Sequence, residues 1–307
     1  MHFQWDDHAD CLIVQLPEPF SYEHNLDYLS RSTNECLFHV DNLDIYKLLR
    51  IVDKDVLIAV NSADSAAMRI RIINIEDAAQ QPELLRAVAE YVWEWFDLGR
   101  DLMPFYDLVQ RDPLLGPVVQ RFHGLRLMGI PDLFEALSWG IIGQQINLTF
   151  AYTLKRRLVE AFGTSLVWEG RTYWSFPSPE TIALLSPDAL TALQFTGKKA
   201  EYLIGVAALI AEGQLTKERL LALGSIQAME KELVRIRGIG PWTANYVLMR
   251  CLRDPAAFPL ADVGLHNALK HVMGLDDKPS LDTITQLAAK WAGWEAYATF
   301  YLWRVLY

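Results

Sequence analysis

The last third of the chain places a glycine turn, a carboxylate and a large aromatic side chain at spacings that could do chemistry. The segment RGIGPWTANY contains Gly238, Gly240 and, two residues further on, Trp242. Asp262 follows 22 residues after Gly240, in the segment FPLADVGLHNAL. The chemistry open to this set is phosphate binding at the turn, together with the action of an ionised carboxylate of fixed direction.

A helix-hairpin-helix is predicted over about 227–253, with the glycine turn between its two helices. Glycine at the turn permits backbone conformations that other residues disfavour, and the first N–H groups of the second helix lack partners within that helix. Such groups can bind a phosphate without a basic side chain, and carbonyls of the turn near Gly238 could also hold a monovalent cation. The alternative is an ordinary turn between two helices that ends in a glycine cap.

Asp262 stands directly before an apolar stripe with helical spacing, which predicts that it caps the start of a helix. Capping and catalysis are compatible, because a helix N-terminus favours an ionised carboxylate and fixes its direction. We therefore expect a loop over 258–266 that presents this carboxylate.

Residues 1–98 contain short apolar segments typical of strands, namely CLIVQL, ECLFHV, VLIAV and MRIRIINI. Apolar and polar residues alternate in the last of these, as they do in a half-buried strand. Pro82 then opens a segment with apolar residues at helical spacing. The prediction for 1–98 is a small antiparallel sheet domain with a helix, and the fold class of the whole chain is α+β.

From residue 99 to residue 307 the strand signal fades and helix starts follow one another. Asp132, Ser178 and Ser186 each precede residues that favour a first helical turn. The prediction for 99–307 is an all-helical body that contains the helix-hairpin-helix and the Asp262 loop.

Composition narrows the class of protein further. The chain has 307 residues, a formal net charge of −10 and three widely spaced cysteines. The acidic balance excludes a protein that holds nucleic acid by a broad basic surface, so any DNA contact must be local. Isolated cysteines predict reduced thiols and no metal site built from side chains, and we expect no cofactor. No long apolar run or secretory signal is present, which predicts a cytoplasmic protein without membrane contact.

The segments LVRIRGIGPWTANYVLMR and FPLADVGLHNAL together resemble the helix-hairpin-helix, loop and aspartate signature of the base-excision DNA glycosylases. Within that superfamily the chain is most similar to the AlkA type, DNA-3-methyladenine glycosylase II. Two further segments, FHGLRLMGIPDLFEALSWGIIGQQI and LQFTGKKAEYLIGVAALI, match that type in the same order. The resemblance covers about 95–307 well and the β-rich region before it more loosely.

The resemblance assigns the catalytic carboxylate to Asp262, which would stabilise the positive charge that grows on the sugar C1′ as an extruded base departs. Superfamily members that also cut the strand carry a lysine at the position of Trp242, and its amine attacks C1′. Tryptophan at this position predicts a monofunctional enzyme, in which water is the nucleophile and an abasic site is the product.

The resemblance also implies an aromatic pocket for the base. Trp242, Tyr246 and Trp303 match the residues that line it, and the first two lie one helical turn apart. Electron-rich rings attract a cationic alkylpurine by about 0.5–2 kcal/mol per ring contact. This favours bases of the 3-methyladenine and 7-methylguanine type over neutral oxidised bases. The alternative for each of the three residues is ordinary core packing.

DNA contacts are implied for the hairpin and for the loop that follows GIIGQQI. In the hairpin they fall on four residues: Gly238, Ile239, Gly240 and Thr243. In the loop, Gln144 matches a residue of the family that lies in the minor groove, and either Gln145 or Ile146 fills the gap that the base leaves. Lys198 and Lys199 could pair with backbone phosphate, although adjacent lysines are more often merely solvated.

The sequence thus predicts a monomeric, monofunctional DNA glycosylase that removes alkylated purines from damaged double-stranded DNA. One alternative is a glycosylase for an oxidised purine such as 8-oxoguanine, which would share the hairpin and the aspartate. Another is a non-catalytic protein that binds damaged DNA through the hairpin alone. Asp262 and the aromatic residues argue against a pure binder, because such a protein needs neither.

Overall fold

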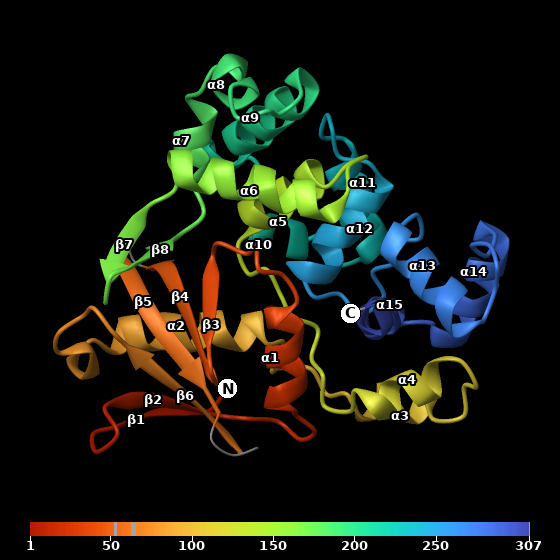
Figure 1. The fold of residues 1–307 in the computed structure, drawn as a ribbon, viewed down its shortest axis with the longest axis horizontal. Coiled ribbons are helices and arrows are strands. Elements are labelled where there is room, and N and C mark those ends of the chain that lie inside the picture. The colour runs from red at the N-terminus through yellow and green to blue at the C-terminus, as the bar shows by residue number, and fades with distance from the viewer. Residues whose placement is uncertain (52–53, 63–65, 307) are drawn as a thin grey trace.

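The N-terminal region forms one antiparallel sheet (Figure 1). The computed structural model describes residues 1–51, 54–62 and 66–306. The strand order is β1-β2-β6-β5-β4-β3, and every neighbouring pair is antiparallel. The strands are β1 (Phe3–Asp6), β2 (Cys11–Gln15), β3 (Phe38–Asp41), β4 (Asp44–Ile51), β5 (Lys54–Asn61) and β6 (Ala67–Ile72).

Hydrophobic patterning predicted part of this sheet. The segments CLIVQL, VLIAV and MRIRIINI coincide with β2, β5 and β6, whereas ECLFHV enters a strand only at Phe38. This patterning did not predict β1, a short strand at the sheet edge, or β4. In β4 even Lys47 is buried, as are Leu48 and Leu49, so apolar and polar residues do not alternate along it.

Two helices accompany the sheet. Helix α2 (Pro82–Trp95) begins at the predicted proline and packs on the sheet through its contacts with β2 and β4. Helix α1 (Tyr22–Ser30) lies at the side of the sheet that is turned toward the rest of the molecule (Figure 1). A short 3-10 turn, η1 (Ala78–Gln80), precedes α2. This confirms the predicted antiparallel sheet with a helix.

The remainder of the chain is mainly helical, as predicted. Its helices are α3 (Met103–Val109), α4 (Leu115–Arg121), α5 (Leu133–Ile142), α6 (Leu148–Phe162), α7 (Pro179–Ala183), α8 (Pro187–Thr191), α9 (Gly197–Ala211), α10 (Lys217–Leu221), α11 (Ile226–Val234), α12 (Pro241–Arg250), α13 (Val263–Val272), α14 (Leu281–Ala288) and α15 (Glu295–Trp303), with 3-10 turns η2 (Ala289–Trp291) and η3 (Arg304–Leu306).

The predicted helix starts hold at all three positions. Asp132 caps α5 and accepts a hydrogen bond from the Glu135 N–H at 2.6 Å, and Ser178 caps α7 in the same way. Ser186 occupies the cap position of α8 without a side-chain bond to the backbone. Local propensity therefore determined where these helices begin.

One hairpin interrupts the helical body. Strands β7 (Ser165–Trp168) and β8 (Arg171–Trp174) follow α6 and reach across to the N-terminal sheet (Figure 1). There, buried Tyr173 packs with Leu48 and Leu57 in a small cluster of its own. This pair departs from the predicted all-helical body. Its strands were not predicted because each has only four residues and its apolar face is complete only against the sheet.

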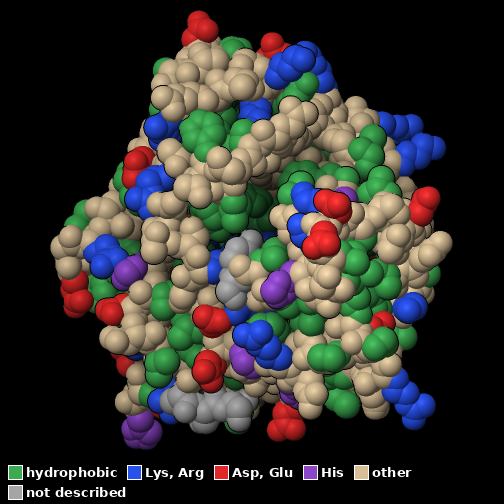
Figure 2. Space-filling view, turned by 45° about the vertical axis from the view of Figure 1, so that its right-hand side comes forward, with side chains coloured by type: hydrophobic (Ala, Val, Ile, Leu, Met, Phe, Trp, Pro, Cys, Tyr) green, Lys and Arg blue, Asp and Glu red, His purple; other side chains and the backbone are tan. Residues whose placement is uncertain are grey.

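A continuous hydrophobic core extends from the sheet into the body. Helix α5 packs against both α9 and α12, while α13 packs against α15. A hollow lined largely by hydrophobic side chains opens on one face of the molecule (Figure 2). None of the described helices is both long and apolar enough to cross a bilayer. The predicted domain boundary at residues 98 and 99 stays a prediction.

Candidate active site

The helix-hairpin-helix consists of α11, a turn and α12. Gly238 has a φ of +94°, and a Cβ at this position would overlap the ring of Tyr202, so both conformation and space require glycine. Gly240 is different, because its φ of −92° is open to other residues and no atom lies near an added Cβ. The expectation that the turn needs special glycine conformations therefore holds for only one of the two glycines.

The start of α12 leaves backbone N–H groups free. Gly240 occupies the N-cap position and provides no side-chain acceptor, and Pro241 has no N–H. Within the described part of the chain, no acceptor bonds the N–H of Trp242 or of Thr243. The whole residues Ile239 and Thr243, backbone included, are only 4% and 2% exposed. Their predicted contacts with DNA stay a prediction.

Asp262 caps α13 and is held by three donors. Its Oδ1 accepts hydrogen bonds from the Leu265 N–H at 2.7 Å and from the indole Nε1 of Trp303 at 2.8 Å. Its Oδ2 accepts a bond from the indole Nε1 of Trp242 at 3.1 Å. The residue is only 8% exposed. The carboxylate is therefore fixed in direction by donors from α12, α13 and α15.

The three predicted pocket aromatics lie around this carboxylate. The rings of Trp242 and Tyr246 are 5.7 Å apart and inclined by 31°, as expected for two residues one turn apart on α12. Trp303 reaches the same place from α15. Burial raises the pKa of Tyr246, so its hydroxyl stays protonated. The sequence predicted this convergence but not the two indole bonds to Asp262.

The glutamine loop after α5 meets the hairpin turn. The side-chain Nε2 of Gln144 donates hydrogen bonds to the Gly238 carbonyl at 2.9 Å and to the Thr243 hydroxyl at 3.1 Å. Its amide nitrogen thus faces the protein, and its predicted minor-groove contact stays a prediction. Gln145 is exposed and has a φ of +57°, whereas Ile146 is half-buried against the core. Of the two candidates for filling the gap, Gln145 is the more exposed.

The structure bears on two predicted ion contacts, the monovalent cation at the hairpin turn and the phosphate at Lys199. The Gly238 carbonyl accepts the bond from Gln144, so a monovalent cation at this carbonyl would compete with an amide, and the cation stays a prediction. Lys199 is buried, and its ammonium donates to the Ile142 carbonyl at 2.8 Å at the end of α5. Lys199 therefore supports the glutamine loop instead of facing phosphate. Among the described residues, no cluster of three or more His, Cys, Asp or Glu could hold a metal ion.

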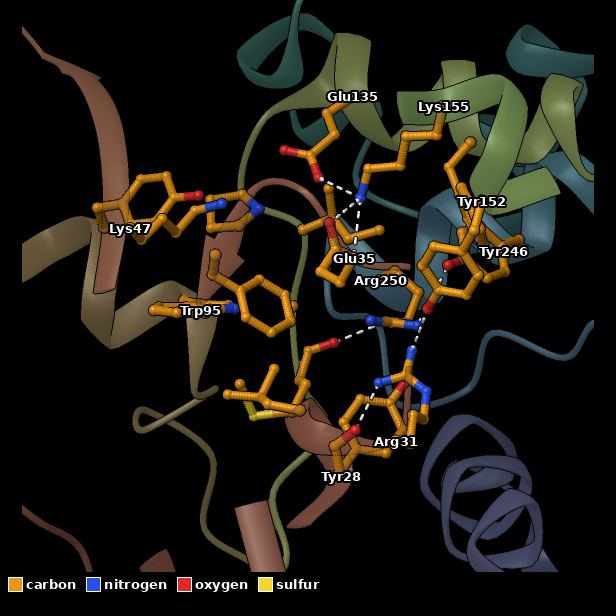
Figure 3. Close-up of a pocket in the computed structure, with 18 residues that line it drawn as sticks. Tyr28, Arg31, Glu35, Lys47, Trp95, Glu135, Tyr152, Lys155, Tyr246 and Arg250 are labelled. Atoms are coloured by element: carbon orange, nitrogen blue, oxygen red, sulfur yellow. Dashed lines mark hydrogen bonds and ion pairs between the residues drawn. The ribbon is translucent and has the colours of Figure 1, made fainter. Parts of the chain in front are cut away.

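A cavity of about 50 Å³ lies beside Tyr246, between the N-terminal region and the helical body (Figure 3). Arg31, at the end of α1, stacks on the Tyr28 ring at 3.7 Å and donates to the Tyr152 hydroxyl at 3.3 Å. Arg250 donates to the Tyr246 hydroxyl at 3.2 Å. No sequence motif pointed to either arginine.

Comparison with known proteins decides the family. Residues 139–293 match the model of the HhH-GPD superfamily of base excision DNA repair proteins, and this range contains the hairpin and Asp262. The chain belongs to the HhH-GPD superfamily. Residues 27–137 match a second model, the N-terminal domain of 8-oxoguanine DNA glycosylase. These matches confirm the resemblance that was inferred from the hairpin and aspartate segments.

Relatives of this HhH-GPD protein span its full length. It is 48% identical to a DNA-3-methyladenine glycosylase of Bacillus subtilis over 99% of both chains. Among solved structures, a 3-methyladenine DNA-glycosylase from Archaeoglobus fulgidus aligns with a TM-score of 0.79 at 21% identity, covering 95% of this chain and 97% of the other. An 8-oxoguanine glycosylase/lyase of Clostridium acetobutylicum bound to double-stranded DNA gives 0.74 at 21% identity, covering 99% and 97%. At these identities the two structures establish the fold alone.

Proposed function

We propose that the protein is a monofunctional DNA glycosylase that hydrolyses the N-glycosidic bond of alkylated purines in duplex DNA and leaves an abasic site. The observation that carries this proposal is a carboxylate, Asp262, that two indoles and a backbone N–H hold beside Tyr246, with Trp242 where strand-cutting members carry lysine. The 48% identity to a relative named DNA-3-methyladenine glycosylase supports the same activity. The enzyme would act as a monomer.

DNA binding would rest on the hairpin and the glutamine loop. The accessible N–H groups at the start of α12 belong to exposed Gly240 and half-buried Trp242, since Thr243 is buried. They suit a phosphate, because they carry the positive end of the helix dipole without formal charge. This fits a chain whose net charge is −10. Gln145 would fill the space that the extruded base leaves, since it is exposed and held in a left-handed conformation at the loop.

Asp262 would act on the sugar of the extruded nucleotide. As the bond to the base breaks, positive charge grows on C1′, and a fixed carboxylate stabilises it without reorganisation. Both carboxylate oxygens already accept hydrogen bonds, so its direction is set before DNA binds. Water then adds to C1′, and the product is an abasic site.

The half-buried ring of Trp242 would face the base, with Tyr246, only 5% exposed, packed beside it at 5.7 Å. The indole offers a π face, which attracts an alkylpurine that is cationic after methylation at N3 or N7. A cationic purine is also an activated leaving group, so this enzyme needs no general acid for it. The glycosylase would therefore favour bases of the 3-methyladenine and 7-methylguanine type.

An oxidised purine is the second candidate substrate, because residues 27–137 match the N-terminal domain of 8-oxoguanine DNA glycosylase. Trp242 counts against it, since strand-cutting members of the superfamily use a lysine amine at that position. Release of 8-oxoguanine in place of methylated purines would favour this alternative.

Duplex DNA treated with a methylating agent tests the proposal. We expect release of free methylated purines and formation of abasic sites, both measured by mass spectrometry. Borohydride, which traps an imine between enzyme and DNA, should give no covalent adduct. DNA binding without base release would leave only a damage-binding protein, and a trapped adduct would contradict the monofunctional mechanism.

Gly264 gives a test of how the carboxylate is held. A Cβ at this position would lie 2.9 Å from Oδ1 of Asp262 and 3.1 Å from Nε1 of Trp303, so Gly264→Ala must displace one of them. We expect the single-turnover rate of base release to fall about tenfold to a hundredfold, because small shifts of a catalytic group are costly. Gly205→Ala is the matched control, since no atom lies within 4 Å of its added Cβ. Equal rates for both variants would contradict the proposed role of the Trp303 bond.

A further inference from the structure

The cavity beside Tyr246 is lined by both the N-terminal region and the helical body, and Tyr246 also contacts Trp242 of the candidate active site. Its wall combines Arg31 from the end of α1, Tyr152 from α6, and Tyr246 and Arg250 from α12 (Figure 3). A volume of about 50 Å³ holds a few water molecules. The cavity is therefore large enough for one edge of a base but not for a whole base.

The two guanidinium groups on this wall are held by neutral acceptors. Neither Arg31 nor Arg250 forms a salt bridge with a described residue. Each donates instead to a backbone carbonyl, at 2.7 and 2.6 Å, and to a tyrosine oxygen. The neighbouring carboxylate of Glu35 is bound by Lys155 at 2.9 and 3.0 Å. Burial lowers the pKa of Arg31, but the charge of Glu35 helps to raise it and so favours the ionised form of Arg31. Carbonyls and tyrosine oxygens leave the two positive charges in place, so the wall suits a ligand edge that brings electron-rich atoms.

The hydroxyl groups on the wall are also available as donors. Arg31 donates to the Tyr152 oxygen at 3.3 Å, and Arg250 donates to the Tyr246 oxygen at 3.2 Å. Neither hydroxyl donates a hydrogen bond to any residue that the structure describes. Because each oxygen already accepts an arginine N–H, its own O–H is free to point elsewhere. The wall therefore presents donors from both tyrosines and from Arg31.

We propose that this donor wall reads the extruded base, and that Arg31 is a specificity-determining residue that favours purines with a carbonyl oxygen at C6 over purines with an amino group there. The proposal rests on the glycosylase function proposed above. A carbonyl oxygen accepts the hydrogen bonds that the wall offers, whereas an amino group would place donors against donors. The positive charge of the two guanidinium groups adds a potential with the same preference. Among methylated purines, 7-methylguanine carries the carbonyl and 3-methyladenine the amino group.

Release of two methylated bases from the same DNA tests the proposed preference for a carbonyl oxygen at C6. Duplex DNA treated with dimethyl sulfate contains both methylated purines, and the released bases are quantified together by mass spectrometry. For Arg31→Met, which keeps the length of the side chain and removes its donors, we expect the ratio of 7-methylguanine to 3-methyladenine release to fall about tenfold. Tyr152→Phe, which removes one hydroxyl, should lower the ratio in the same direction by about threefold.

Arg50→Met is the matched control, because Arg50 lies on β4 with an exposed side chain paired to Asp55. This variant should keep the wild-type ratio. A ratio that stays unchanged in Arg31→Met and Tyr152→Phe would overturn the proposed wall, as would equal losses of both bases. If the wild-type protein releases neither base, the glycosylase function itself fails and the inference fails with it. Melting temperature and affinity for abasic-site DNA verify that each variant is folded.

Discussion

Asp262→Asn should lower the rate of base release by about a thousandfold or more, because it removes the one negative charge that faces C1′ in the proposed mechanism. The substitution otherwise changes the size and shape of the side chain very little. The Asn oxygen can still accept the bonds that Leu265 and Trp303 donate to Oδ1. The amide nitrogen, however, would face the Trp242 N–H, where Oδ2 now accepts a bond at 3.1 Å. The loss should appear in single-turnover cleavage of methylated duplex DNA.

Stability and DNA affinity separate this effect from misfolding. Asparagine caps helices about as well as aspartate does, so α13 should keep its start. Asp132→Asn is a matched control, since Asp132 caps α5 with the same geometry. This control should retain normal turnover, and both variants should bind DNA containing an abasic site. Substantial base release by Asp262→Asn would show that another group stabilises the transition state.

The sequence predicted most of the site because its residues are linked by local rules. Trp242 and Tyr246 share one face of α12 since they are four residues apart, and Asp262 caps α13 as its following apolar stripe indicates. Local spacing could not place Trp303, because it lies on a separate helix. Only the family resemblance predicted that it lines the pocket. Helix caps at Asp132 and Ser178 follow the same local chemistry.

Contacts between distant segments could not be predicted. Arg31 meets Tyr152 across 121 residues of sequence, and no spacing rule links an arginine at the end of α1 to a tyrosine on α6. Gln144 turns toward the hairpin only because α5 and α12 pack together, which orients its amide toward Gly238 and Thr243. Lys199 resembled a solvated lysine in sequence, yet it lies under the end of α5.

In the proposed function the N-terminal region contributes to the site as well as supporting it. Lys155 on α6 binds Glu35, which precedes β3, and the buried ion pair connects the body to the segment that carries Arg31. Breaking one partner of a buried pair leaves an uncompensated charge, so this connection specifies one relative position of the two regions. The proposed donor wall, which combines residues of both regions, is thereby held in one arrangement.

Trp242 should show two separable functions when it is replaced. Trp242→Phe keeps an aromatic face beside Tyr246 but removes the N–H that holds Oδ2 of Asp262. We expect it to lower single-turnover base release about tenfold to a hundredfold, since hydrogen bonds to charged groups contribute about 1.5–3 kcal/mol. Trp242→Ala also removes the π face, which adds about 0.5–2 kcal/mol for a cationic base. Its rate should fall about a hundredfold or more.

Comparing these two variants separates the contribution of the Trp242 N–H from that of its ring. If the N–H alone matters, Trp242→Phe and Trp242→Ala will lose the same amount of activity on 7-methylguanine. If the ring alone matters, Trp242→Phe will match the wild-type rate. Trp168→Phe is the control, since Trp168 lies on β7 and packs against Tyr46 and Tyr173, apart from the carboxylate. The expected stepwise loss would mean that tryptophan both directs Asp262 and contacts the base, two tasks that a lysine at this position could not combine.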